Sequence, residues 1–325
     1  MREHAHDLTS SSIRRRLVLL LCLLAGNAAR SQELEPRTYS PAPVGANFAL
    51  VAYNYQSGDV LFDPAVPITN VRAYVNSMTP GFGRSFNLAG RYASISLAVP
   101  YAWASVGGDV LEQYTEITRS GLGDMRLRFV VNLIGAPALP PRVWATRKLE
   151  TTLGFSLAVQ APTGQYSPEK LINIGTNRWA FKPEFGLSYP TGPWTLEAAA
   201  GVWLFTNNTA TYPGTVVRSQ DPLFSFQGHV GYTFRPGFWL AANATYYAGG
   251  KTYANDVPGD TRQANSRAGL TFSLPVARGQ TIKLSASTGV DARIGSKFDT
   301  YGIAYQILWF DRQLLAPVAG SQGSK

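Results

Sequence analysis

Cysteine and histidine are almost absent from this sequence of 325 residues. It contains one cysteine, Cys22, and three histidines, His4, His6 and His229. One thiol cannot form an intrachain disulfide, and so few nitrogen and sulfur ligands do not make a Cys/His metal site. We therefore expect no cofactor and no metal, and a stability that comes from the backbone hydrogen-bond network.

Charge and long apolar runs are also scarce. Only 15% of the residues are charged, whereas a soluble domain carries about 25%. After the N-terminal region no segment reaches about 18 consecutive apolar residues, which excludes helical membrane spans, and no sustained helical periodicity is present. The low charge is typical of a protein whose outer surface is not entirely exposed to water.

The N-terminus has the pattern of a cleaved signal peptide over residues 1–31. Three arginines at 14–16 precede an apolar core at 17–25, and Ala29 and Ser31 lie at the −3 and −1 positions of a cleavage before Gln32. The core is shorter than the roughly 20 residues that a transmembrane anchor requires. The sequence thus predicts an exported chain with a periplasmic N-terminal segment over 32–44.

Strict alternation replaces helical periodicity in the rest of the chain. In "GLGDMRLRFVVNLIG" (121–135), Leu127 and Phe129 share one parity, and Arg126 and Arg128 share the other. Comparable strand-like segments are 48–55, 72–86, 91–99, 149–160, 179–189, 194–205, 223–235, 238–247, 266–274, 280–290 and 301–310. Together they predict an even number of about 12 strands.

The connections between these strands alternate in length. Long polar connections are expected at 56–71, 101–120, 161–178, 206–221, 248–265 and 291–300, whereas the others are short turns except 136–148. This layout is typical of an outer-membrane barrel with extracellular loops and periplasmic termini. A soluble β-sandwich alternates similarly, but its wet face would carry more Lys and Glu. We predict an all-β, antiparallel transmembrane barrel of the outer-membrane type over 45–310, with a C-terminal tail at 311–325.

In a barrel the polar parity faces the lumen, because a charge facing lipid at mid-membrane costs about 2–4 kcal/mol. Trp203, Phe205, Trp239 and Tyr247 share the inward parity. Two interpretations of the lumen charges stay open: they attract anionic solutes into a pore, or they pair and brace the barrel. The predicted lumen-lining residues are Arg126, Arg128, Lys182, Glu184, Glu197, Gln227, His229, Arg267 and Lys283.

Five segments carry a resemblance to a known family. They are 57–68 ("SGDVLFDPAVPI"), 119–139, 161–190, 220–250 and 265–275. In these the chain resembles the bacterial outer-membrane proteins of the MetA-pathway of phenol degradation family. The resemblance implies an outer-membrane barrel that acts as a channel or transporter, and it brings no catalytic site. The tail "DRQLLAPVAGSQGSK" departs from barrels that end on an aromatic residue.

The expected function is passive diffusion of small solutes, with an aromatic body or an anionic group matching the lumen. The alternatives are a barrel enzyme that modifies lipids, a plugged structural or adhesive barrel, and a soluble exported β-protein. A His-x-Ser arrangement of a barrel lipase is missing, because Gly231 and not a serine stands two residues after His229. The basic residues are dispersed and form no recognition motif, which argues against nucleic-acid binding. We expect the outer membrane of a Gram-negative bacterium, with its lipid, lipopolysaccharide and assembly machinery as partners.

Overall fold

The computed structural model of this chain describes residues 35–61, 68–110 and 113–311. The predicted signal peptide and the predicted tail after Asp311 lie outside the described residues. In the described part, no helix is long and apolar enough to cross a membrane.

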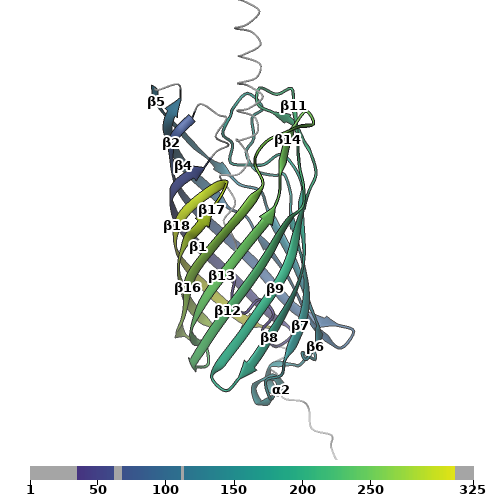
Figure 1. Cartoon of the computed structure of the whole chain (residues 1–325). Helices are drawn as coiled ribbons and strands as arrows, with labels where there is room; N and C mark the ends of the chain where they lie inside the picture. The colour runs from purple at the N-terminus through teal and green to yellow at the C-terminus, as the bar shows by residue number, and fades with distance from the viewer. Residues whose placement is uncertain (1–34, 62–67, 111–112, 312–325) are drawn as a thin grey trace, which may run out of the picture.

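Twelve strands form a closed antiparallel barrel, as the alternation predicted (Figure 1). Each strand pairs with its neighbours in the ring, and β1 closes it by pairing with both β18 and β2. In ring order from β1 the strands are β1 (Ala46–Leu61), β18 (Gly295–Phe310), β17 (Gln280–Ala292), β16 (Gln263–Ala277), β13 (Phe238–Gly249), β12 (Leu223–Arg235), β9 (Trp194–Phe205), β8 (Ala180–Thr191), β7 (Thr152–Gln160), β6 (Arg126–Ile134), β3 (Arg91–Ala98) and β2 (Ile68–Leu88).

The two faces of the wall differ as the pleat of a strand requires. On β8, Phe185, Leu187 and Tyr189 are exposed on the outside, while Lys182 and Glu184 are almost completely buried on the inside. Residues that are partners in the antiparallel register share a face, so the inward set continues from strand to strand. The apolar outer face is the one that meets lipid in a membrane barrel.

The wall extends further than the sequence predicts over 101–120, where a loop was expected. β4 (Tyr101–Val110) and β5 (Gln113–Leu122) form a hairpin that pairs with the first half of β2. Pro100 separates β3 from β4, because a proline has no N–H to donate to a neighbouring strand. No described strand pairs with the far edge of β5, which lies at the rim of the barrel beside β2 and β4 (Figure 1).

The expectation of a long connection over 291–300 was wrong. β17 and β18 leave only Arg293 and Ile294 between them. The two strands pair with each other only up to Ser287 and Thr300, and the Asn265 side chain holds the bend beyond that point: it donates to the Ile294 carbonyl (2.8 Å) and accepts from the Arg293 N–H (3.0 Å). A cross-strand amide therefore satisfies backbone groups that a longer loop would leave to water.

The long connections expected at 161–178, 206–221 and 248–265 lie at one end of the barrel (Figure 1), whereas the described residues of 56–71 belong to β1 and β2, and 62–67 lie outside the described residues. At this end of the barrel, β10 (Asn208–Thr211), β11 (Val216–Gln220), β14 (Thr252–Ala254) and β15 (Val257–Pro258) form a separate four-stranded sheet. The opposite end carries short turns and α2 (Pro141–Thr146), which lies in the long turn at 136–148.

We expect the wall to distinguish neighbouring residues by the face they occupy. Leu284 points outward near the middle of β17, and Ser285 points inward; both are exposed. Leu284→Arg should lower the free energy of unfolding by about 2–4 kcal/mol, because arginine then faces lipid. Ser285→Arg, the matched control, should change it by much less. Urea titration of the protein refolded into lipid vesicles measures both, and equal losses would contradict the assigned parity.

Candidate functional site in the barrel lumen

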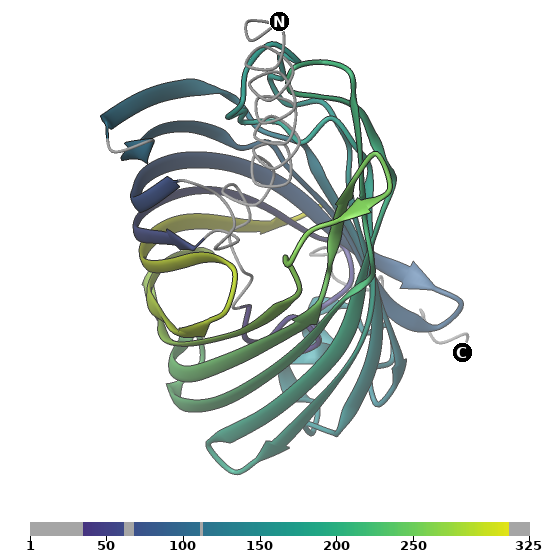
Figure 2. The ribbon, with the colours of Figure 1, turned by 45° about the horizontal axis from the view of Figure 1, so that its top comes forward.

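The segment Glu35–Gly45, here called the strap, lies inside the barrel before β1 begins (Figure 2). The sequence predicted a periplasmic segment over 32–44; its described residues instead pack on the inward faces of β7, β8, β9 and β12. The physical reason is the density of polar groups on those faces. The Arg37 N–H donates to Glu197 Oε2 (2.6 Å), and the Ser40 hydroxyl donates to Glu197 Oε1 (3.3 Å).

The Tyr39 ring lies in a slot formed by two glycines. Gly154 of β7 and Gly186 of β8 are register partners on the inward face. A Cβ built on Gly186 would lie 2.0 Å from Tyr39 Cε2, and one on Gly154 would lie 2.4 Å from Tyr39 Cδ1. Any larger side chain at either position would overlap the ring. We call this pair of glycines and the space between strap and wall the glycine slot.

The Tyr39 hydroxyl reaches a buried carboxylate at the end of the slot. It donates to Glu184 Oε1 (2.9 Å) and lies 3.0 Å from Ser156 Oγ. Burial raises the pKa of the Tyr39 hydroxyl above its ordinary value, and the negative charge of Glu184 raises this pKa further. The hydroxyl therefore stays protonated at neutral pH and remains a donor.

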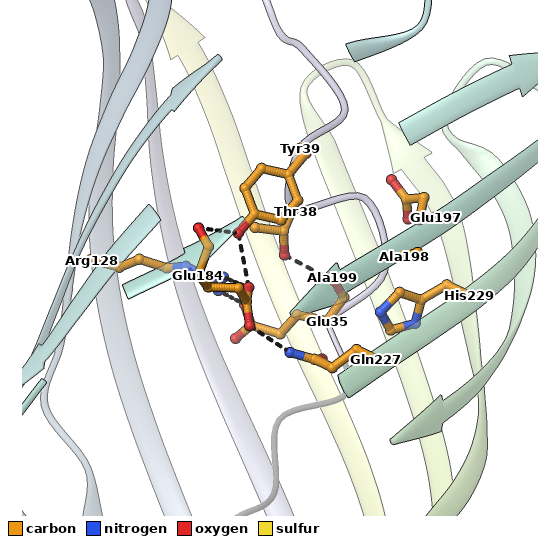
Figure 3. A pocket seen from close by; sticks show the side chains of 10 residues that line it. All are labelled: Glu35, Thr38, Tyr39, Arg128, Glu184, Glu197, Ala198, Ala199, Gln227 and His229. Atoms are coloured by element: carbon orange, nitrogen blue, oxygen red, sulfur yellow. Dashed lines mark hydrogen bonds and ion pairs between the residues drawn. The ribbon is translucent and has the colours of Figure 1, made fainter. Parts of the chain in front are cut away.

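Glu184 is the centre of a buried ionic network (Figure 3). Its Oε2 lies 2.7 Å from Lys182 Nζ and accepts from Gln227 Nε2 (2.9 Å), and its Oε1 lies 3.2 Å from Arg128 Nη2. Arg128 also pairs with Glu35 of the strap. Gly201 on β9 makes room for this carboxylate, because a Cβ there would lie 3.0 Å from the Glu184 Cβ.

Arg37 fixes the strap to β12 and β13, farther round the wall from β7 and β8. Its Nη2 donates to Thr233 Oγ1 (2.5 Å), and its guanidinium lies 4.6 Å from the centre of the Trp239 ring. Burial lowers the pKa of Arg37, and the charge of Glu197 opposes that shift. The group remains cationic at neutral pH, because the ordinary pKa of arginine is far above 7.

Most of the predicted lumen residues gather around the strap, but two do not. Arg128, Glu184, Glu197, Gln227 and His229 line one pocket beside the strap (Figure 3), and Lys182 contacts it through Glu184. His229 Nδ1 lies 2.8 Å from Asn243 Oδ1. Arg126 and Arg267 lie elsewhere on the inward wall, whereas Lys283 of β17 interacts with the charges of Glu35 and Arg37 in the strap.

The strap residues and the glycines were missed by the sequence reasoning. Tyr39, Ser156 and the two slot glycines carry no charge, so a search for inward charges passes over them. A signal existed in "TLGFSL" (152–157) and "PEFGLSY" (183–189), where a glycine interrupts each inward row. A glycine inside a strand marks a place where another group approaches closely.

A second buried carboxylate holds the loop 161–178 over the mouth. Asp124 accepts from the Gly164 N–H (2.9 Å), from the Thr176 N–H (3.0 Å) and hydroxyl (2.6 Å), and from Gln160 Nε2 (2.9 Å). These donors satisfy the carboxylate without an ion pair. In the described part of the chain, no group of three His, Cys, Asp or Glu side chains is placed to hold a metal ion.

Comparison with known proteins agrees with this architecture. The sequence model of the family described as "Putative MetA-pathway of phenol degradation" matches residues 56–307. An outer membrane channel from Pseudomonas putida F1 is similar in structure, with a TM-score of 0.75 and 19% identity over 85% of this chain and 100% of that one. At this identity the likeness shows the fold alone.

Two further structures are more distant. The β domain of the Bordetella autotransporter BrkA has a TM-score of 0.48 and 13% identity, over 82% of this chain and all of that one. The CymD monoaromatic hydrocarbon channel has a TM-score of 0.44 and 9% identity, over 89% of this chain and 99% of that one. Such scores say nothing specific about this chain. No curated protein matches the sequence.

Proposed function

We propose that this chain, which belongs to the MetA-pathway of phenol degradation family, is an outer-membrane channel that passes small solutes by passive diffusion. The observation that carries the proposal is the uneven filling of the lumen. The inward residues of β7 and β8 are buried under the strap, whereas Ser285 on β17 is exposed on the inward face. A passage along the β17 side of the lumen fits this difference.

The charges around the strap largely compensate one another. Glu184 forms ion pairs with Lys182 and Arg128. Glu197 accepts a hydrogen bond from the Arg37 backbone N–H, and its charge opposes that of the Arg37 guanidinium. This pairing supports the bracing interpretation for Arg128 and Lys182, rather than the interpretation in which they attract solutes. Compensated charges inside a barrel stabilise the wall without creating a strong field in the passage.

The remaining positive charge of the predicted lumen set on this side of the wall lies on β16 and β17. Arg267 and Lys283 project inward from β16 and β17, and Arg267 Nη2 donates to the hydroxyls of Ser287 (2.7 Å) and Thr300 (3.0 Å). Fixed positive charge beside a passage raises the local concentration of anions. We infer a preference for anionic over cationic solutes that arises from these two residues.

Conductance across a planar bilayer tests the channel directly. We expect a measurable conductance from the protein purified from membranes, with a reversal potential that reports a preference for anions. Lys283→Gln should reduce that preference and leave the free energy of unfolding nearly unchanged. No conductance from the native protein would contradict the proposal and favour a plugged structural barrel.

Surface labelling tests the proposed location and orientation in a Gram-negative outer membrane. Asp256 lies at the exposed tip of the β14–β15 hairpin, and Gly192 lies in the short turn between β8 and β9. We expect an epitope tag at Asp256 to be labelled on intact cells and a tag at Gly192 to be labelled only after the outer membrane is opened. The reverse pattern would overturn the orientation.

A further inference from the structure

Positive charge gathers at the end of the barrel that carries the short turns and α2 (Figure 1). This end, here called the turn end, comprises residues 84–91, 133–152, 189–196, 232–240, 274–282 and 308–311. Its basic residues are Arg84, Arg91, Arg142, Arg147, Lys148, Arg235 and Arg278, and its acidic residues are Glu150 and Asp311. Arg84 forms an ion pair with Asp311, and Glu150 interacts with the charge of Arg147. The turn end therefore keeps a net positive charge after its own acidic groups are counted.

At the opposite end of the barrel, basic and acidic side chains are interspersed. Arg293 forms an ion pair with Asp260. On the outer face, Asp59 of β1 is the register partner of both Arg72 and Lys297, and all three side chains are exposed. Interspersed charges of both signs create little net field. An anionic partner would therefore be attracted to the turn end.

Two of the turn-end arginines lie on neighbouring hairpins. Arg235 ends β12, and Arg278 lies in the turn between β16 and β17. The two turns are in contact, because a Cβ on Gly237 would lie 3.5 Å from the Cβ of Pro275. Both arginine side chains are exposed, and neither forms an ion pair with a carboxylate of the described residues. This pair offers two guanidinium groups to one partner.

A continuous row of aromatic rings covers the outer wall next to this pair. From β9 to β16 the rings belong to Trp194, Tyr232, Phe234, Phe238 and Phe272. The centres of successive rings are between 4.8 and 5.3 Å apart, and the Arg235 guanidinium lies 5.6 Å from the centre of the Phe238 ring. Aromatic girdles mark the membrane–water interfaces of a barrel. A cation that contacts this row therefore lies at the depth of the lipid headgroups.

The long turn at 136–148 repeats the combination of apolar and basic side chains. Val143 of α2 and Leu149 are exposed large apolar side chains, and Arg142 and Lys148 beside them are exposed cations. Such a combination is typical of segments that lie in the membrane interface. The turn end thus presents the same chemistry to its surroundings at two separate places on the ring.

We propose that Arg235, Arg278 and the row of aromatic rings form a binding site for the headgroup of an anionic phospholipid such as phosphatidylglycerol. The inference goes beyond solute passage and rests on the proposed location, in which the turn end contacts the periplasmic leaflet of the outer membrane. The arginine forks match the phosphate oxygens, while the rings contact the glycerol and the upper acyl chains. Because its cations attract negative surfaces, the site prefers phosphatidylglycerol to the zwitterionic phosphatidylethanolamine.

Native mass spectrometry of the protein released from mixed micelles of these two lipids measures the preference directly. One basic residue near an anionic lipid surface changes the affinity by roughly fivefold. Arg235→Gln with Arg278→Gln should therefore lower the preference for phosphatidylglycerol by more than about tenfold. The matched control, Arg72→Gln with Lys297→Gln, removes two exposed cations from the other end and should leave the preference unchanged. Equal losses in both double variants, or no preference in the native protein, would overturn the proposal.

Two further measurements separate the lipid from the charge and from the fold. Arg235→Lys with Arg278→Lys keeps both charges and should keep most of the preference. In phosphatidylcholine vesicles the glutamine double variant should have the native free energy of unfolding, whereas added phosphatidylglycerol should stabilise the native protein more than this variant. Equal stabilisation of the two proteins would contradict the site.

Inorganic phosphate distinguishes a lipid site from a site for any free anion. It carries the phosphate chemistry without the glycerol and the acyl chains, so it should not displace the retained phosphatidylglycerol at an equal concentration. Complete displacement by inorganic phosphate would show that the rings do not take part, and would contradict the lipid as the specific partner.

The lipid site and the channel can fail independently. Conductance in a bilayer of phosphatidylcholine, in a protein that shows no preference for phosphatidylglycerol, would keep the channel and reject the lipid site. A preference for phosphatidylglycerol in a protein without conductance would keep the lipid site and reject the channel. Labelling on intact cells of the tag at Gly192, which belongs to the turn end, would reject the periplasmic leaflet as the source of the lipid.

Discussion

Gly186→Ala should drive Tyr39 out of the barrel wall and raise the conductance severalfold. The new methyl carbon would lie 2.0 Å from Tyr39 Cε2. The backbone of Gly186 belongs to a regular strand in a φ region open to alanine, so β8 keeps its place and the strap must move. With the ring displaced, the hydroxyl loses both Glu184 and Ser156, and the space that the strap occupied becomes available to solutes.

Gly231→Ala is the matched control for this change. Gly231 also faces inward from a strand, but a Cβ there would come no closer than 3.7 Å to any neighbour, which is an ordinary contact. Conductance of the refolded Gly231→Ala protein should equal that of the native protein. If Gly186→Ala leaves the conductance at the native level while the barrel still folds, the strap does not restrict the passage.

The alternation of side chains made the barrel predictable. Leu127 and Phe129 on one face and Arg128 on the other determine which side of β6 meets lipid, because the cost of a misplaced arginine exceeds most other local preferences. The same rule applied strand by strand gives the twelve-stranded ring that the structure shows. This information is local and periodic, so it can be read from a single strand without knowing which strands pair with it.

The contents of the barrel could not be predicted in this way. The hydrogen bond from Tyr39 to Glu184 spans 145 positions in the sequence, and that from Arg37 to Glu197 spans 160. Such contacts depend on how the wall curves, which no periodicity records. The glycines at 154 and 186 became meaningful only when their register partnership placed them side by side.

Local reasoning also failed at the rim. The segment 101–120 contains two glycines and several polar residues and was interpreted as a loop, yet it pairs as β4 and β5. Aromatic and β-branched residues such as Tyr101, Trp103 and Ile117 favour a strand there, and the pairing with β2 outweighs the glycines and polar residues. In the same way, the lumen charges could be assigned to a face from the sequence, but their pairing could not.

The Glu184→Leu variant should lose about 3–5 kcal/mol of its free energy of unfolding, the largest loss expected for a single lumen residue. Glu184 and Lys182 each have only 2% of the side chain exposed, and the carboxylate also receives Arg128. Removing one partner of a buried pair leaves an uncompensated charge, which is the costly case. Urea titration of the refolded protein, followed by tryptophan fluorescence, measures the loss.

The double variant Lys182→Met with Glu184→Leu isolates the cause of that loss. Both buried ions are then replaced by apolar groups of similar size, and such replacements are often neutral or stabilising. Arg128 keeps Glu35 as a partner, so no lone charge is created. We expect the double variant to recover most of the stability that Glu184→Leu loses. A double variant as unstable as the single one would show that Glu184 acts through its bonds to Tyr39 and Gln227, and not as the counter-ion of Lys182.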